Sequence, residues 1–194
     1  MKQRCPWPGE SAEMIEYHDK EWGRPLFDDK KLFEFFLLDT FQAGLSWQII
    51  LSKRNGFKKA FANFNVAKVA RYGRGEVRRL LGNPGIIRNK RKIEAAIHNA
   101  QNILVMKEEY GSFAKYLWGF TRGKTIHHAV RRLEDIPATS KEAATMSKDM
   151  RARGFKFVGP TTLYAFMQGI GMVNDHLISC FCYKKLKKAS LRRF

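Results

Sequence analysis

Apolar residues recur at helical spacing along most of the 194-residue chain. This pattern constrains the fold more than any other feature of the sequence. Between residues 88 and 107, Ile93, Ile97, Ala100 and Leu104 follow one another at steps of four, three and four, which is typical of an amphipathic helix. Alternating runs of Val, Ile and Thr are nearly absent, so any sheet is expected to be marginal. The chain is therefore predicted to be all-α.

Capping residues indicate further helices in the first half of the chain. Asp28 or Asp29 can cap a helix that carries a run of Leu and Phe, and a second helix is expected from about Gln42 to Ser52. Residues 122–137 lack such signals and are expected to form a looser connection.

The net charge of the chain indicates what kind of partner it binds. The chain has 36 Lys and Arg against 18 Asp and Glu, a formal charge of +18, which indicates a polyanion such as nucleic acid, although a generally basic surface is the simpler explanation. Residues 1–183 are expected to form a single domain of two closely packed helical halves. Residues 184–194 carry six cations and no acid, and we expect a mobile, solvated tail there.

Apolar runs long enough for a membrane span or a signal peptide are absent from the sequence. We therefore expect a cytoplasmic protein, associated with the nucleoid if the polyanion is DNA.

Cysteine and histidine residues gather near the two chain ends. Cys5 and His18 lie near the N-terminus, and His176 and Cys180 lie four residues apart, a spacing that places both on one face of a helical turn. Two thiolates and two imidazoles suit tetrahedral zinc with no open position, which is a structural site. Cys182 could replace Cys180, and each histidine could instead be an ordinary buried polar residue.

Two glycine turns precede predicted helices. After a capping box at residues 139–142, a helix is expected to end at Gly154, and Pro160 can begin another that runs to about Gly169. The turn between them resembles a helix–hairpin–helix element, in which backbone N–H groups hold a phosphate. Residues 83–91 form a similar turn with three cations. Both turns are also compatible with plain helix junctions.

Aromatic residues and one carboxylate form a second candidate site. Trp7, Tyr17 and Trp22 fall within the first 22 residues, and Asp39 and Trp47 follow further along the chain. Aromatic residues of this kind are usually core, but flat rings with one carboxylate also make a slot for a planar, electron-poor base.

Five segments resemble the signature blocks of the bacterial type I 3-methyladenine DNA glycosylases, and they occur in the family's order. They are RCPW at 4–7, YHDKEWG at 17–23, FQAGLSW at 41–47, RGFKFVG at 153–159 and VNDH at 173–176. The resemblance covers the chain from residue 4 to about residue 183.

The resemblance implies a helix–hairpin–helix glycosylase fold and a monomer that excises 3-methyladenine from alkylated double-stranded DNA by hydrolysis, without a lyase step. It implies one structural zinc ion per chain on Cys5, His18, His176 and Cys180. It also implies a base pocket and a DNA-binding surface. The base-binding residues would be Trp7, Tyr17, Trp22, Asp39 and Trp47, of which Asp39, Tyr17 and Trp47 would be catalytic. The DNA-binding residues would be Gly44, Leu45, Gly85, Arg88, Lys90, Lys156, Gly159 and Thr161, with Gly44 and Leu45 filling the gap left by the flipped base.

Two positions depart from the family pattern. Asp39 stands where the family usually has Glu, and Met14 stands where it often has Tyr. They leave open a damaged-DNA-binding module of the same fold without catalysis, or a glycosylase with altered lesion specificity. A basic RNA-binding protein remains a further alternative, and a zinc hydrolase is disfavoured because four protein ligands close the metal site. Asn174 and Asp175 lie where related glycosylases carry a catalytic aspartate, but no general base is assigned.

Overall fold

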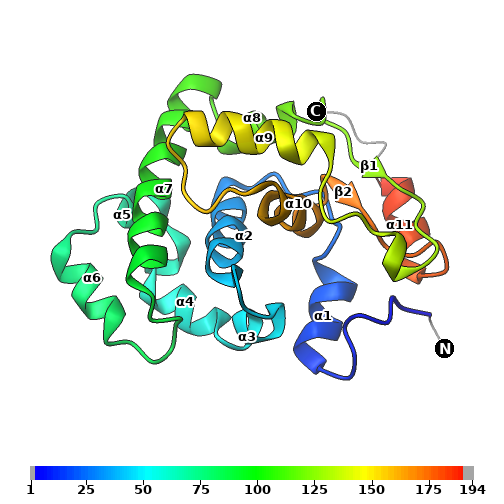
Figure 1. The fold of residues 1–194 in the computed structure, drawn as a ribbon, viewed down its shortest axis with the longest axis horizontal. Helices are drawn as coiled ribbons and strands as arrows, with labels where there is room; N and C mark the ends of the chain where they lie inside the picture. The colour runs from blue at the N-terminus through cyan, green and yellow to red at the C-terminus, as the bar shows by residue number, and fades with distance from the viewer. Residues whose placement is uncertain (1–2, 190–194) are drawn as a thin grey trace.

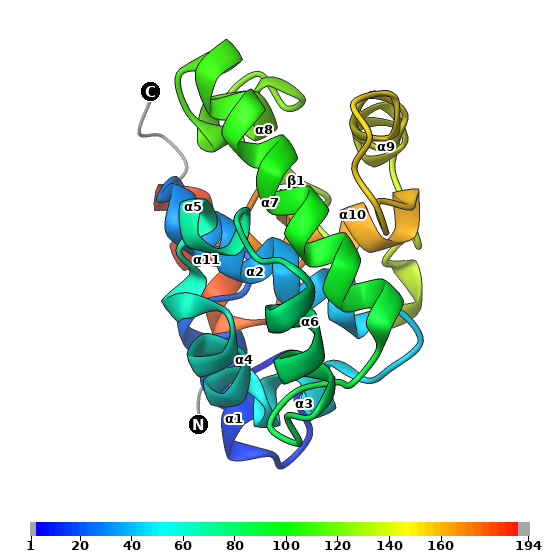
Figure 2. The same ribbon diagram turned by 90° about the vertical axis from the view of Figure 1, so that its left-hand side faces the viewer.

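The structure is a computed structural model that describes residues 3–189, and it is mostly helical (Figures 1 and 2). The predicted all-α class is confirmed. The elements, in chain order, are α1 (Ala12–Lys20), α2 (Asp29–Gln42), α3 (Trp47–Ser52), α4 (Arg54–Ala60), η1 (Ala62–Phe64), α5 (Val66–Val69), α6 (Arg74–Leu81), α7 (Lys90–Tyr110), α8 (Phe113–Gly119), β1 (Ile126–His127), η2 (Leu133–Asp135), α9 (Lys141–Ala152), α10 (Pro160–Gly169), β2 (Val173–Asn174) and α11 (Phe181–Ala189).

Helix α2 lies at the centre of the fold, and every residue from Leu32 to Phe41 is buried. The Asp28 carboxylate caps its start by accepting a hydrogen bond from the backbone N–H of Lys31 at 2.8 Å, as predicted. The Phe36 ring meets Phe rings of α8, of the turn after α9, and of α10 edge to face, at centroid distances of 6.0, 5.8 and 5.4 Å. A helix that is apolar on all sides must be covered on all sides, and the surrounding helices cover α2.

The chain leaves the helical conformation between α2 and α3, so the helix predicted from Gln42 begins instead at Trp47. Gly44 has φ +78°, a left-handed conformation that glycine adopts without steric cost. The Ser46 hydroxyl then accepts a hydrogen bond from the backbone N–H of Ile49 and caps α3. These two residues produce the short exposed loop 43–46, of which Leu45 is the tip.

Helix α7 spans the predicted amphipathic stripe, and α9 and α10 lie where capping signals placed them. Ser140 caps α9, Gly154 follows its end with φ +87°, and Pro160 is the first residue of α10. The marginal sheet is a parallel pair of two-residue strands, β1 and β2, with Ile126 opposite Val173. It joins the connection 122–137 to the C-terminal part of the chain.

The N-terminal segment lies beside the start of α11 (Figure 1). The backbone N–H of Phe181 donates to the carbonyl of Gln3 at 2.9 Å, and that of Leu177 donates to the Cys5 sulfur at 3.4 Å. The fold therefore brings the N-terminal Cys and His into reach of the C-terminal pair.

The expected solvated tail from Lys184 is wrong as far as Ala189, because α11 continues to that residue. Leu186 is only 3% exposed and belongs to the hydrophobic core, so this part of α11 packs against the fold. The remainder of the predicted tail, 190–194, lies outside the described residues. No helix within residues 3–189 combines the length and the apolar character needed to cross a membrane.

Candidate functional site

A cavity of about 450 Å³ opens between α1, α2, α3 and α10. The five residues of the predicted base pocket all line it. The full lining is Trp7, Met14, Tyr17, Trp22, Asp39, Gln42, Trp47, Leu133, Ile136, Ala165 and Gln168.

Aromatic rings form one continuous wall of the cavity. The Trp7 ring meets the Trp22 ring edge to face at 5.0 Å and the Tyr17 ring at 6.3 Å, and the rings of Tyr17 and Trp47 are 5.2 Å apart. The indole nitrogens of Trp7 and Trp47 are buried and bond to no described residue. A buried donor without a partner is costly, so these two N–H groups are available to a ligand.

Asp39 supplies the carboxylate of the cavity. It is 5% exposed, and its side chain accepts no hydrogen bond from any residue in the described part of the chain. Burial raises the pKa of the Asp39 carboxyl well above its ordinary value, because a charge is poorly solvated there. The charged form of this group therefore gains from a cation or hydrogen-bond donor that enters the cavity.

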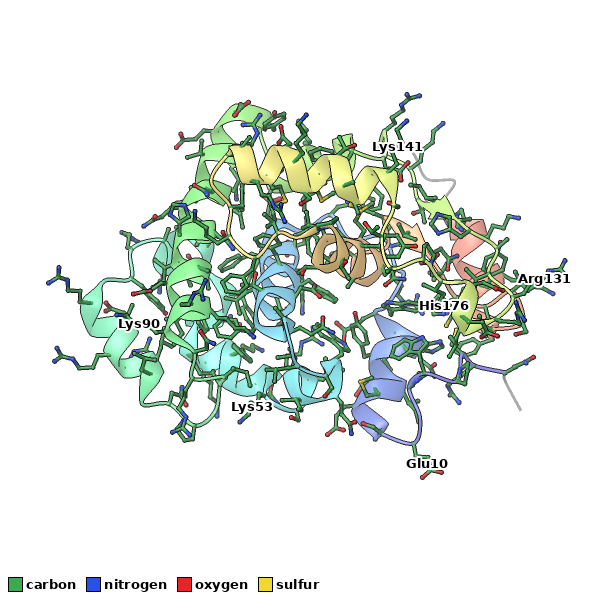
Figure 3. The ribbon with its side chains drawn as sticks, in the orientation of Figure 1. Glu10, Lys53, Lys90, Arg131, Lys141 and His176 are labelled. Atoms are coloured by element: carbon green, nitrogen blue, oxygen red, sulfur yellow. The ribbon has the colours of Figure 1, made fainter. Side chains whose placement is uncertain are left out.

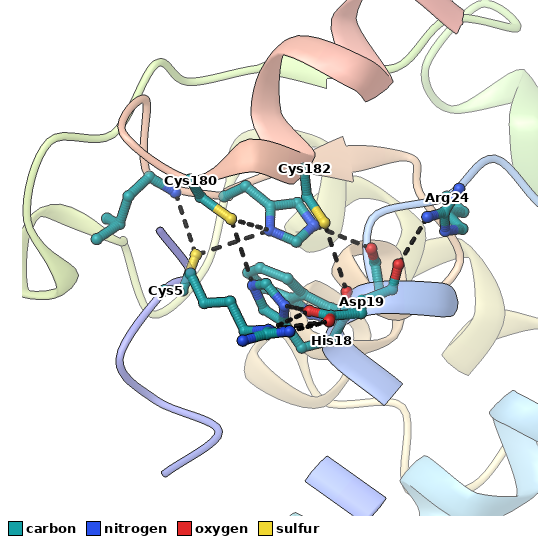
Figure 4. Close-up of polar contacts among 10 residues, drawn as sticks. Cys5, His18, Asp19, Arg24, Cys180 and Cys182 are labelled. Atoms are coloured by element: carbon teal, nitrogen blue, oxygen red, sulfur yellow. Dashed lines mark hydrogen bonds and ion pairs between the residues drawn. The ribbon is translucent and has the colours of Figure 1, made fainter. Parts of the chain in front are cut away.

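Two cysteines and two histidines form a buried group (Figure 4). The two histidine rings contact the Trp7 and Trp22 rings of the aromatic wall. One ligand atom from each of Cys5, His18, His176 and Cys180 lies within 4.8 Å of the others. The Cys180 sulfur is 3.6 Å from both His18 Nε2 and His176 Nδ1, and the Cys5 sulfur is 3.7 Å from His176 Nδ1. Such a group can hold a metal ion. Of the residues labelled in Figure 3, His176 is fully buried, whereas Lys90 is exposed.

Both histidines are oriented by hydrogen bonds through their second ring nitrogen. His18 Nδ1 is 2.8 Å from the Asp19 carboxylate, which Arg4 also binds, and His176 Nε2 is 3.1 Å from the Trp22 carbonyl. Bonds of this kind fix which nitrogen faces a metal. The Trp22 ring also meets the His176 ring edge to face at 4.5 Å, so the Cys and His group supports the cavity wall.

Cys182 lies beside this group but belongs to a second, smaller cluster with His18 and Asp19. Its sulfur is 4.0 Å from the His18 carbonyl. Hydrogen bonds from the thiols of Cys182 and Cys5 hold the pKa of Cys180 far below its ordinary value.

The predicted hairpin between α9 and α10 is held against α7 by its backbone. The Asn99 amide accepts from Lys156 N at 2.8 Å and donates to Lys156 O at 3.0 Å, and His98 Nε2 is 3.0 Å from the Gly154 carbonyl. Lys156 and Thr161 are exposed on either side of Gly159, the residue that precedes α10. An exposed cation therefore lies in the turn just before α10, where the first N–H groups of a helix lack partners within the helix.

The second turn, residues 83–89, packs backbone to backbone on α4. The N–H of Gly85 donates to the Asn83 side chain at 2.8 Å, and Lys53 Nζ donates to the Pro84 carbonyl at 2.8 Å. A Cβ on Gly56 would overlap the Gly85 carbonyl, so glycine is required at position 56. Arg88 and Lys90 are exposed at the start of α7.

Asp175 does not line the cavity but binds a residue that does. Its buried carboxylate accepts hydrogen bonds from Tyr164 at 2.6 Å and Gln168 at 2.7 Å, and His128 Nδ1 lies 2.7 Å from it. Burial and the bond to Asp175 raise the pKa of Tyr164 above its ordinary value. The Asp175 carboxylate therefore has three partners within the fold.

Several cavity residues have no role in the sequence interpretation. Gln168 is a polar residue in an otherwise apolar stretch of α10, a signal that could have marked it. Leu133 and Ile136 come from the connection 122–137, which carried no signal of a role in the site.

A cavity of aromatic rings and one buried carboxylate, in a basic helical protein, is suited to hold a planar ring such as a base flipped out of nucleic acid. The family model for methyladenine glycosylase matches residues 7–183. DNA-3-methyladenine glycosylase of Haemophilus influenzae is 42% identical over 182 residues, which are 94% of this chain and 98% of that protein.

Solved structures of 3-methyladenine DNA glycosylase I have a fold similar to that of this chain. A crystal structure of 3-methyladenine DNA glycosylase I has a TM-score of 0.91 and 42% identity, and covers 93% of this chain and 100% of its own. A Tyr-to-Phe variant of 3-methyladenine DNA glycosylase I, crystallised in complex with 3-methyladenine, has a TM-score of 0.90 and 34% identity, and covers 93% of this chain and 97% of its own. The chain belongs to the methyladenine glycosylase family.

Proposed function

We propose that this chain excises 3-methyladenine from alkylated double-stranded DNA by hydrolysing the N-glycosidic bond. The observation that carries the proposal is the buried Asp39 carboxyl, which faces an aromatic cavity without a partner among the described residues. A relative of 42% identity carries the name of this activity, and a protein of the same fold was crystallised with 3-methyladenine.

Charge explains how the cavity would select the lesion. Methylation at N3 gives the base in DNA a positive charge, which the faces of Tyr17 and Trp47 and an ionised Asp39 all attract. Normal adenine carries no charge and would leave the negative charge of a buried Asp39 carboxylate without a counter-charge. The lesion also pairs poorly, so it costs less to flip out of the helix.

The same positive charge weakens the glycosidic bond, so the leaving base needs no proton from the enzyme. Asp39 would accept hydrogen bonds from the base edge, with Trp7 and Trp22 closing the slot, while water attacks the anomeric carbon. Of the described residues that line the cavity, none is a lysine, which supports hydrolysis without a Schiff base. Covalent trapping of the protein on DNA by borohydride would contradict this part of the proposal.

DNA would lie across three backbone turns. Helices α9 and α10 would act as the helix–hairpin–helix element, with Lys156, Gly159 and Thr161 at a phosphate. Gly85, Arg88 and Lys90 would hold a second phosphate. Leu45, which is 36% exposed at the tip of loop 43–46, would fill the gap left by the flipped base, with Gly44 allowing the turn.

The Cys and His group fits zinc. Tetrahedral zinc with Zn–S near 2.3 Å and Zn–N near 2.0–2.1 Å requires sulfur and nitrogen atoms about 3.6 Å apart. The three separations recorded here are 3.6, 3.6 and 3.7 Å. We therefore assign Cys5, His18, His176 and Cys180 as zinc ligands. With four protein ligands, the ion would cross-link the chain ends and hold the wall of Trp7 and Trp22 rather than activate water.

Release of free 3-methyladenine from methylated duplex DNA, resolved by chromatography, tests the function. Wild type should release the base, and Asp39→Asn should release it about 100-fold or more slowly, because a charge that stabilises the reacting base is lost. Glu10→Gln is the matched control, since Glu10 is an exposed carboxylate (Figure 3) that does not line the cavity.

Equal release by wild type and Asp39→Asn would keep the enzyme but remove the role of Asp39. A zinc-loaded, folded wild type that binds methylated DNA without releasing the base would contradict the proposal and favour a damage-binding module.

A further inference from the structure

Lys92 is a buried lysine that serves neither the cavity nor the surface. It lies in the first turn of α7 and is 6% exposed. Its ammonium donates to the Phe41 carbonyl at 2.8 Å and to the Ala43 carbonyl at 2.6 Å. Both acceptors belong to the end of α2 and the loop that follows it.

Two costs oppose a lysine at this place. An ammonium loses its hydration when buried, and a positive charge in the first turn of α7 faces the positive end of that helix dipole. The end of α2 offsets both costs, because its last carbonyls lack partners within the helix and its dipole is negative there. The last turn of α2 contains no basic residue of its own. Lys92 therefore provides the cation that caps α2 from outside the helix.

The carbonyls that Lys92 binds flank the loop that would enter DNA. Asp39 lies two residues before Phe41, and Gly44 and Leu45 directly follow Ala43. The N–H of Leu45 donates to the Gln42 carbonyl at 2.6 Å, so the tip of the loop is tied to the same helix end. Helix α2 is packed on all sides by the core, whereas loop 43–46 is exposed. Loss of Lys92 should therefore move the loop more than the cavity.

Lys92 also lies directly after the second glycine turn, residues 83–91, which would hold a phosphate. The Asn89 side chain accepts a hydrogen bond from the backbone N–H of Lys92 at 3.2 Å and caps α7, and Arg88 and Lys90 are exposed on either side of it. Figure 2 shows the first turn of α7 beside the segment that joins α2 to α3. The start of α7 thus carries the exposed cations Arg88 and Lys90 on its outer side. On its inner side it carries the Lys92 ammonium, which binds the end of α2 and loop 43–46.

We propose that Lys92 is a positioning residue that couples the phosphate turn 83–91 to loop 43–46, so that Leu45 is correctly placed for base extrusion once the phosphate is bound. This inference rests on the proposed glycosylase function. Under this inference, extrusion of the base from the duplex depends on Lys92, whereas recognition of the base depends on the cavity.

Lys92→Met in the zinc-loaded protein tests the coupling. Single-turnover excision from methylated duplex DNA should fall about 100-fold, the cost of a misplacement of about 1 Å. Excision from methylated single-stranded DNA, which leaves no gap in a duplex to fill, and the affinity for free 3-methyladenine should be unchanged. Lys141→Met, which removes one exposed lysine charge on α9, should leave both rates at the wild-type value.

A double-mutant cycle with Leu45→Ala distinguishes coupling from general damage. If Lys92 acts through the loop, Lys92→Met should cause little further loss on duplex DNA in the Leu45→Ala background. Lys92→Gln, whose amide can still donate to one carbonyl, is the second variant if Lys92→Met does not fold, and it should show a smaller loss confined to the duplex.

Any of three results would overturn the coupling. Lys92→Met could lower the excision rate equally on duplex and single-stranded DNA, it could lower neither rate, or its effect could add to that of Leu45→Ala. The absence of base release by wild type on both substrates would instead refute the proposed function itself.

Discussion

Replacing Cys180 by serine should remove the metal and much of the stability of the protein. The cluster joins Cys5 to His176 across 171 positions of the chain. In the chain-entropy treatment a cross-link that closes a loop of about 100 residues is worth about 4.7 kcal/mol, and the logarithmic dependence on length makes this about 5 kcal/mol here. In a chain of this size each kcal/mol corresponds to about 2–4 °C, so the variant should melt about 10–20 °C lower.

Cys182→Ser is the matched control, because Cys182 is also a buried cysteine of the C-terminal segment and differs from Cys180 in its place outside the four-residue group. Metal analysis should find about one zinc per chain in wild type and Cys182→Ser, and none in Cys180→Ser. A chelator should lower the Tm of wild type and leave that of Cys180→Ser unchanged. Retention of zinc and Tm by Cys180→Ser would refute the ligand assignment, and loss of zinc from Cys182→Ser alone would make Cys182 the ligand.

Three further variants test the packing, the titration and the DNA contact. Gly56→Ala should lower the Tm, because its Cβ would overlap the Gly85 carbonyl and overpacking typically costs about 1–3 kcal/mol, whereas Gly75→Ala, with open space around the Cβ, should be tolerated in the same melting assay. Burial raises the pKa of Asp39 in the folded protein, so the folded state holds this proton to higher pH than the unfolded chain does, and stability should fall as pH rises from about 4 through the raised pKa. Asp39→Asn should therefore melt higher than wild type at neutral pH and equally below about pH 4, and equal Tm values at every pH would show that the carboxyl titrates normally. Lys156→Gln should reduce the slope of log affinity against log salt by about one unit, and an unchanged slope would remove Lys156 from the phosphate contact.

Local structure was largely predictable from the sequence. The stripe of Ile93, Ile97 and Ala100 marked α7, and Asp28 and Pro160 marked the starts of α2 and α10. Periodicity and capping depend on residues within a few positions of one another, so they act before any tertiary contact is made. Most of the candidate metal ligands and the aromatic cavity residues were also predictable, because they lie in or next to sequence blocks that resemble one family.

The interior of the site was less predictable. Leu133 and Ile136 line the cavity from a segment without a recognisable pattern, and Lys92 looks like one more cation in a basic turn. Their roles arise from the way in which distant helices pack, which spacing along the chain does not encode.

The sequence by itself determined the helical class, the positions of the long helices and the identity of the residues with chemistry to offer. The tertiary structure alone decided where the chain breaks between α2 and α3, that Leu186 holds the basic end of α11 against the core, and that the metal-binding group stands behind the wall of Trp7 and Trp22. Helical propensity is local, whereas burial of a side chain and the partner of a carbonyl depend on residues up to 171 positions away.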